Sequence, residues 1–234
     1  MAFRLIPAGS FRMGSRGYSP REEPIHWVTI PEPFWMAETP VTQAQFALWT
    51  SSERINHTNH FAGHPIHPAE NMDWRQAVTF CAWLTRLKAG ELPPGFALAC
   101  LPTEAEWEYA CRAGTTTLWS FGSDVGQLAN YAWYDTGSPA ISFPQKVGGK
   151  RPNPWGLYDV HGNVREWVQD FYDEGYYTRF IDLDPKGPDT GTERVVRSGY
   201  WRDEARYVRS ANRFHQVPDE RNSLIGFRLF RKGT

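Results

Sequence analysis

The feature that most restricts the fold of this chain is the frequent interruption of its apolar segments by glycine and proline. The sequence contains 20 Gly and 18 Pro in 234 residues, and no long helical period follows Gly114. Because 15% of the residues are aromatic, including 11 Trp, we expect large rings to fill the core. The sequence therefore predicts one irregular, loop-rich α+β domain that spans residues 1–234.

Short strands and three helices are predicted before Gly114. The first forty residues alternate short apolar runs with Gly and Pro, which is typical of short strands. Helices are predicted to begin at Thr42, Asp73 and Thr103, because each of these residues caps helices well. Glu106 stands three residues after Thr103 and completes a capping box, and a glycine marks the end of each of the last two helices.

The overall charge excludes partners that are attracted by a strong electrostatic field. The formal net charge is −1 and the pI is about 6.7, so we expect no nucleic-acid partner and no attraction to an anionic membrane. The starting residues MAFRLIPAGSFRMG contain no long apolar run, and no segment approaches the length of a membrane span. We therefore expect no membrane insertion and a cytoplasmic location.

The cysteines do not form a recognisable functional pattern. The chain has three, Cys81, Cys100 and Cys111, an odd number whose spacing fits no metal site. Each lies in an apolar or helical context. We predict buried, unpaired thiols in a reducing compartment.

Four histidines lie close together in the sequence SSERINHTNHFAGHPIHP. They are His57, His60, His64 and His67, and their number suggests a zinc site. The segment is rich in loop-forming residues and lacks both helical spacing and accompanying acids. We favour a polar, hydrogen-bonded loop over a metal site.

Two acidic pairs have different interpretations. Glu104 and Glu106 lie at a predicted helix start, where carboxylates interact favourably with the helix dipole, so a structural role is favoured over paired acid–base catalysis. In WGLYDVHGNVREW, by contrast, the side chains of Asp159 and Glu166 flank backbone carbonyls that could turn inward in a tight loop. Such hard oxygen donors could bind calcium, although a structural turn is the alternative.

Several longer sequence motifs resemble those of one known family. They include PAGSFRMGS, ETPVTQAQF, LPTEAEWEYACRAG, NPWGLYDVHGNVREWVQD and PDERNSLIGFRLF. Together they resemble the formylglycine-generating enzyme (sulfatase-modifying factor) family over nearly the whole chain. The resemblance implies a variant of the C-type lectin fold, which is loop-rich and has few helices. It also implies a structural calcium bound by the side chains of Asp159 and Glu166 and the carbonyls of Gly162 and Val164.

The residues that the family uses for catalysis are replaced in this chain. The enzymes oxidise a substrate cysteine with two active-site cysteines that bind copper. The resemblance places Arg206 at the second of these positions and the first near Trp201, and no cysteine follows Cys111. Without thiolate ligands a Cu(I) site cannot be built, so we expect neither copper nor formylglycine generation.

The C-terminal segment 197–231 combines a regular framework with chemically unlike residues between its positions. The framework includes Arg197, Gly199, Trp201, Arg213 and IGFR at residues 225–228. This layout resembles the variable proteins of diversity-generating retroelements, which display a variable region on the same type of scaffold. The gap positions are Tyr200, Arg202, Asp203, Tyr207, Phe214, His215, Val217, Ser223 and Leu224.

We expect the gap side chains to point outward and to form a surface that binds a protein, glycan or small-molecule ligand. On this interpretation, truncating Phe214 or Tyr207 would barely change stability. One alternative is an enzyme of the same superfamily with altered chemistry, whose pocket would gather His215, Asp203 and Arg206. Another is an accessory subunit with a large apolar partner face.

Overall fold

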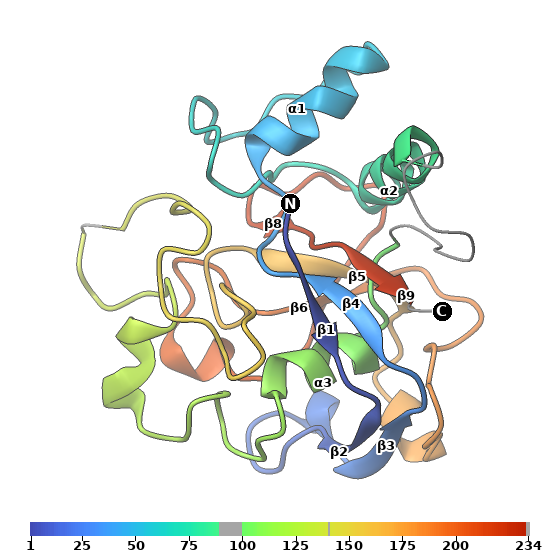
Figure 1. Cartoon of the computed structure of the whole chain (residues 1–234). Coiled ribbons are helices and arrows are strands. Elements are labelled where there is room, and N and C mark those ends of the chain that lie inside the picture. The colour runs from blue at the N-terminus through green and yellow to red at the C-terminus, as the bar shows by residue number, and fades with distance from the viewer. Residues whose placement is uncertain (89–99, 140, 233–234) are drawn as a thin grey trace.

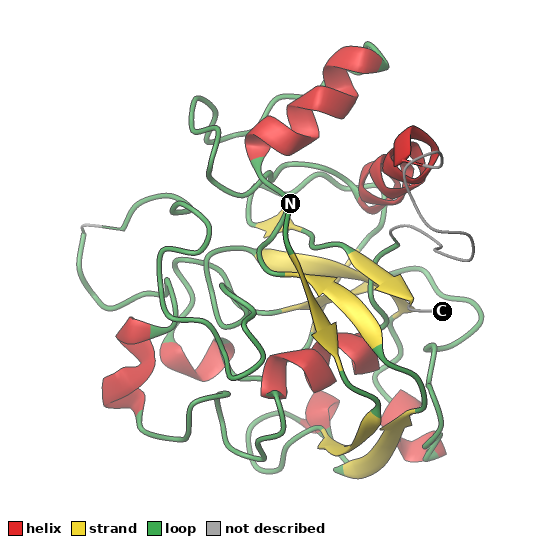
Figure 2. Ribbon diagram, viewed as in Figure 1, coloured by secondary structure: helices red, strands yellow, loops and turns green. Residues whose placement is uncertain are grey.

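A computed structural model describes residues 1–88, 100–139 and 141–232 of the chain. Short strands and three α-helices are connected by long loops (Figures 1 and 2). The helices are α1 (Gln43–Ser52), α2 (Trp74–Lys88) and α3 (Glu104–Arg112). The strands are β1 (Phe3–Ile6), β2 (Gly9–Met13), β3 (His26–Ile30), β4 (Phe34–Ala37), β5 (Arg165–Phe171), β6 (Arg194–Arg197), β7 (Phe214–Gln216), β8 (Ile225–Gly226) and β9 (Phe230–Lys232).

The helices begin where their capping residues predict. The side-chain oxygen of Thr42 accepts the N–H of Gln45, and the side-chain oxygen of Asp73 accepts the N–H of Gln76. Thr103 and Glu106 form the predicted capping box of α3, with reciprocal bonds of 3.2 and 2.7 Å. These starts depend only on residues within one helical turn, which is why the sequence predicts them.

The strands form three small sheets with the orders β1-β4-β9, β2-β3 and β7-β6-β5-β8. Strand β9, close to the C-terminus, pairs antiparallel with β4, so the first and last strands of the chain share one sheet with β4 between them (Figure 1). Strand β5 pairs antiparallel with β6 and parallel with β8. This last sheet brings the framework of the C-terminal segment together.

Aromatic rings fill the core, as the composition predicts. One cluster lies between α3 and the first strands and includes Trp107 and Phe34. A second cluster joins α1 and α2 to the C-terminal strands and includes Trp49, Trp167 and Phe227. All five of these side chains are fully buried.

Buried ion pairs join the C-terminal segment to the N-terminal half. Glu104 on α3 accepts hydrogen bonds from Arg197 and Arg213 at 3.1 and 2.6 Å. Glu22 binds Arg209 through both carboxylate oxygens at 2.8 Å. The framework arginines therefore point inward and fix the path of the segment, because a buried charge is stable only when it is paired.

Among the helices that the structure describes, none combines the length and the apolar character that crossing a bilayer requires.

Candidate functional site

Most framework residues of the C-terminal segment are more buried than its gap residues, although the framework residues Asp219 and Arg221 are exposed. Framework residues such as Arg197, Gly199 and Val208 are buried. Of the nine gap residues, Arg202 and Val217 are exposed and six are half-buried. The half-buried residues are Tyr200, Tyr207, Phe214, His215, Ser223 and Leu224. Eight of the nine gap side chains therefore keep some exposure, although only Arg202 and Val217 are fully exposed.

Asp203 is the exception, because it is only 7% exposed and points inward. The guanidinium group of Arg165 on β5 donates to both carboxylate oxygens of Asp203 at 2.9–3.0 Å. Burial raises the pKa of Asp203, and the nearby Arg165 partly opposes that rise. The expectation that Asp203 is a surface side chain is wrong, since a neighbouring strand supplies the cation that allows it to be buried.

The guanidinium group of Arg165 contacts three gap residues. Its guanidinium lies 3.5 Å from the ring centre of Phe214 and 4.9 Å from that of Tyr200, in addition to binding Asp203. Its backbone N–H donates to the carbonyl of Leu224. We call Arg165, Tyr200, Tyr207, Phe214 and Leu224 the aromatic patch, in which the rings of Tyr207 and Phe214 are 6.4 Å apart.

A pocket of about 470 Å³ lies next to this patch, because the residues that follow Tyr200 in the sequence help to line it. Trp201 and Arg202 form one side of it, and Tyr134, Asp135 and Ile141 form much of the other. Arg202 makes no ion pair with the residues that the structure describes. Sequence reasoning missed Tyr134, Asp135 and Ile141, because these residues are about sixty positions before the C-terminal segment.

His215 and Arg206 do not join Asp203 in one pocket. His215 stacks on Tyr172 with ring centres 4.2 Å apart and lies 2.9 Å from a carboxylate oxygen of Glu193. Arg206 is exposed and pairs with the exposed Glu204 at 3.2 Å. Among the described residues, the cluster predicted for an altered enzyme is therefore not formed.

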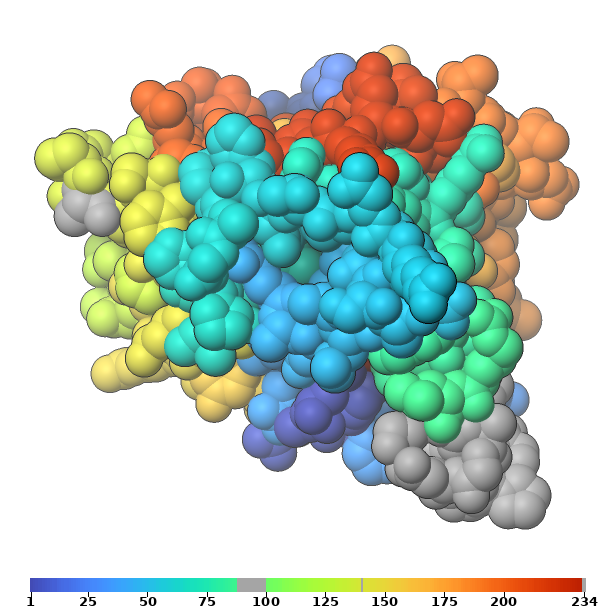
Figure 3. Space-filling view, turned by 90° about the horizontal axis from the view of Figure 1, so that it is seen from above, coloured from blue at the N-terminus to red at the C-terminus, as the bar shows by residue number. Residues whose placement is uncertain are grey.

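The histidine loop packs against the same face of the molecule. His64 and His67 stack with ring centres 4.5 Å apart, and both stack on Phe143. Phe61 meets Trp201 edge-on at 6.1 Å. Figure 3 shows this face, with the loop after α1 between the yellow segment that precedes β5 and the red C-terminal residues. Over the ranges that the structure describes, no three His, Cys, Asp or Glu side chains converge as metal ligands would.

Asp159 and Glu166 are both buried but differ in their partners. Oδ2 of Asp159 accepts the N–H of Gly148 at 2.8 Å, whereas Oδ1 has no hydrogen-bond partner among the described residues. Burial raises the pKa of Asp159 to about 6. Arg228 donates to both oxygens of Glu166 at 2.7 Å, and Trp107 donates to Oε2 as well. Asp159 thus has a free acceptor, and Oε1 of Glu166 keeps one lone pair.

The thiol prediction is confirmed at two positions and wrong at the third. Cys81 and Cys111 are buried and unpaired. Cys100 is unpaired but exposed. It exchanges backbone hydrogen bonds with Phe230, so its pairing with β9 leaves the side chain at the surface.

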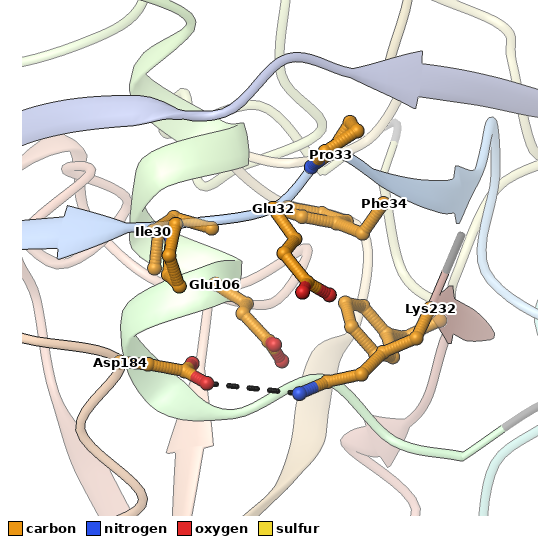
Figure 4. Close-up of a pocket in the computed structure, with 9 residues that line it drawn as sticks. Ile30, Glu32, Pro33, Phe34, Glu106, Asp184 and Lys232 are labelled. Atoms are coloured by element: carbon orange, nitrogen blue, oxygen red, sulfur yellow. Dashed lines mark ion pairs between the residues drawn. The ribbon is translucent and has the colours of Figure 1, made fainter. Parts of the chain in front are cut away.

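Glu104 and Glu106 have the structural roles predicted for them. Glu104 binds the buried arginines described above, and Glu106 caps its own helix. Glu106 also lines a small pocket of about 130 Å³ with Asp184 and Lys232, which form an ion pair of 3.6 Å (Figure 4). This pocket lies apart from the C-terminal gap positions.

The fold and the aromatic patch define a class: a loop-rich lectin-type α+β domain with aromatic side chains on its C-terminal segment. The domain family described as "Sulfatase-modifying factor enzyme 1-like domain" matches residues 2–233. The chain belongs to this family, which confirms the resemblance noted in its motifs.

Among curated relatives, the formylglycine-generating enzyme of Streptomyces coelicolor is 29% identical and is matched over 95% of this chain and 87% of the enzyme. The serine/threonine-protein kinase Pkn1 of Chlamydia trachomatis serovar L2 is 31% identical over 96% of this chain. The chain spans only 37% of the length of that kinase and of two similar chlamydial proteins.

Solved structures give the same fold. PvdO from Pseudomonas aeruginosa has a TM-score of 0.86 and 28% identity, over 99% of this chain and 94% of that one. Treponema denticola variable protein 1 has a TM-score of 0.85 and 30% identity, over 99% and 95% respectively. The predicted formylglycine-generating-enzyme type of C-type lectin fold is confirmed.

Proposed function

We propose that this chain is a non-catalytic ligand-binding protein whose C-terminal segment is diversified by a retroelement. The observation that carries the proposal is the burial contrast within residues 197–231, where most framework side chains are buried and eight of nine gap side chains keep some exposure. Likeness to a variable protein of Treponema denticola supports it. Variation at such positions costs little stability, whereas variation of the framework would unpair buried charges.

The ligand would contact both the aromatic patch and the adjoining pocket. Tyrosine and phenylalanine supply large contact areas with few rotatable bonds, which favours them in binding surfaces. A pocket of about 470 Å³ is large enough for a small molecule or for part of a protein or glycan. The patch and the pocket are continuous through Tyr200, Trp201 and Arg202.

Deep sequencing of the 3′ end of the gene across a cell population tests this proposal. We expect substitutions at the codons of gap residues such as Arg202 and Tyr207, constant framework codons such as that of Arg197, and a near-copy template beside a reverse transcriptase. An invariant 3′ end without a template would reject diversification.

Similarity to formylglycine-generating enzymes favours a second candidate, an enzyme with chemistry that does not depend on cysteine. Incubating the purified chain with a cysteine-containing sulfatase peptide, with and without copper, tests this candidate by mass spectrometry of the peptide. We expect no conversion, because His215, Asp203 and Arg206, which such an enzyme would use, do not share a pocket. Conversion of the peptide cysteine would overturn the non-catalytic proposal.

We also propose a structural calcium at Asp159, the carbonyls of Gly162 and Val164, and Glu166. The donor set fits in part. The buried Oδ1 of Asp159 lacks a partner, which is costly unless a cation or water supplies one. Glu166 would contribute only through its remaining lone pair, because Arg228 already binds both of its oxygens. The bound ion would stabilise the turn before β5.

Adding calcium to chelator-treated protein should raise the melting temperature by about 5 °C at saturation. The Asp159→Ala variant should show no rise, whereas Asp219→Ala, which removes an exposed carboxylate, should respond like the parent. Equal melting curves for the parent with and without calcium would count against the site.

A further inference from the structure

A pocket of about 260 Å³ lies outside the candidate ligand site and is lined by positively charged and hydroxyl side chains. Arg16 comes from the loop after β2, Arg112 from the end of α3, and Arg209 from the C-terminal framework. Ser15 and Thr116 add hydroxyl groups. No Asp or Glu of the described residues lines this pocket.

Arg112 and Arg209 are held rigidly by partners behind the pocket wall. Nε and Nη2 of Arg112 bind Glu108 at 2.7–2.8 Å, Nη2 also donates to the carbonyl of Gly14, and Nη1 donates to that of Thr117. These contacts use four of the five N–H groups of a guanidinium. Only 4% of Arg112 is exposed, so its orientation is fixed before any ligand arrives.

Arg209 has a matching arrangement. Its Nη1 and Nη2 bind the two oxygens of Glu22 at 2.8 Å, Nη1 also contacts Ser15, and Nε donates to the carbonyl of Arg206. Four N–H groups are again used, and one remains. The ring of Tyr18 lies 4.0 Å from this guanidinium and is 51% exposed, so it can contact a group that extends out of the pocket.

Arg16 supplies a mobile charge at the rim. It is exposed and forms no ion pair with any residue that the structure describes. Glu22 and Glu108, which neutralise the two fixed arginines, are fully buried behind them. The pocket is therefore lined by two nearly buried guanidinium groups whose carboxylate partners lie on the protein side, and Arg16 is its exposed charge.

We propose that this pocket binds a phosphate group, free or on a small organic ester. A planar carboxylate is satisfied by one guanidinium, whereas a tetrahedral oxyanion has enough acceptor oxygens for Arg16, the remaining N–H groups of Arg112 and Arg209, and the Thr116 hydroxyl. The Ser15 hydroxyl is not counted, because it already donates to Glu22. A phosphate monoester also carries close to two negative charges at neutral pH, which suits a pocket without acids. Tyr18 would contact the organic part of an ester.

Calorimetric titration of the full chain with inorganic phosphate and with phenyl phosphate, at low ionic strength and neutral pH, tests the proposal. We expect saturable binding of one equivalent and tighter binding of phenyl phosphate, because its ring can contact Tyr18. The Arg16→Ala variant should bind about tenfold more weakly. Arg86→Ala is the matched control, since it removes an exposed arginine of α2 that lies far from β2 in Figure 1, and it should bind like the parent.

Thr116→Val provides a second variant at an exposed position, so folding is not at risk, and it should weaken phosphate binding about threefold through the lost hydroxyl. Sulfate and acetate titrations define the ligand class: sulfate should compete more weakly than phosphate, and acetate should not compete. The proposal is overturned by absence of saturable phosphate binding, by equal affinity of Arg16→Ala and the parent, or by acetate competing as well as phosphate. None of these results depends on whether the C-terminal segment is diversified.

Discussion

His161 shows how strongly the fold can constrain one side chain. It is 1% exposed, with Nδ1 3.1 Å from the carbonyl oxygen of Val208 and Nε2 3.0 Å from the amide nitrogen of Ser120. This geometry places the proton on Nδ1 and leaves Nε2 as an acceptor, so the ring is neutral. Burial lowers the pKa of His161 to about 3.

His161 should therefore make the protein sensitive to acid. The unfolded side chain titrates near 6.5 and the folded one near 3, so the unfolded state binds an additional proton in that window and stability is lost as the pH falls through it. His161 should contribute at most about 1.4 kcal/mol per pH unit to the slope of the free energy of unfolding against pH. Urea unfolding at several pH values should show a smaller slope for His161→Asn than for the parent. His60→Asn, which changes an exposed histidine, should leave this slope unchanged. If His161→Asn also has the slope of the parent, the assignment to His161 is wrong.

At the scale of elements, β7 divides the gap residues between two faces of its sheet. Phe214 pairs with Val196, and His215 pairs with Val195, so successive side chains point in opposite directions. Phe214 packs against the second core cluster and beneath Arg165. The expectation that all gap residues form one surface is therefore too simple, because strand geometry separates neighbours in sequence.

The same geometry changes the expected effect of truncating Phe214. Phe214→Ala should lower the free energy of unfolding by about 2 kcal/mol, because it removes core packing and uncovers Arg165. Val217→Ala should change it by less than about 0.5 kcal/mol, since Val217 is 39% exposed. Urea denaturation of the two variants measures the difference. Equally small effects would restore the fully exposed placement that the sequence suggests.

At the scale of the whole molecule, buried carboxylates connect distant parts of the chain. Glu104 on α3 binds Arg197 on β6 and Arg213 near β7, and Glu108 one turn later binds Arg197 as well. All of these side chains are buried. Fixed interior charges therefore set the path of the C-terminal segment independently of the side chains on its outer surface.

Neutralising Glu104 should destabilise the molecule far more than neutralising a surface acid. Glu104→Gln leaves two buried arginines with incomplete partners and should cost about 3–5 kcal/mol, a large part of the stability of a typical domain. Glu204→Gln, which breaks the exposed pair with Arg206, should cost less than about 1 kcal/mol. Thermal and urea unfolding compare the two, and similar losses would show that the interior pairs do not hold the segment in place.

The sequence by itself determined the features that depend on neighbours along the chain. Helix starts at Thr42, Asp73 and Thr103 follow from capping within one turn, and most framework residues of the segment 197–231 are buried as their pattern suggests. The motifs also determined the family, because they retain the residues that the fold requires.

Only the tertiary structure decided which distant residues complete each site. Arg165 reaches the gap residues from another strand, and that contact allows Asp203 to be buried. Backbone pairing with β9 leaves Cys100 at the surface. Arg16, Arg112 and Arg209 line one pocket although they are far apart in the sequence. Local patterns report the direction of a side chain relative to its own element, whereas its charge partners and burial depend on contacts that only the folded chain creates.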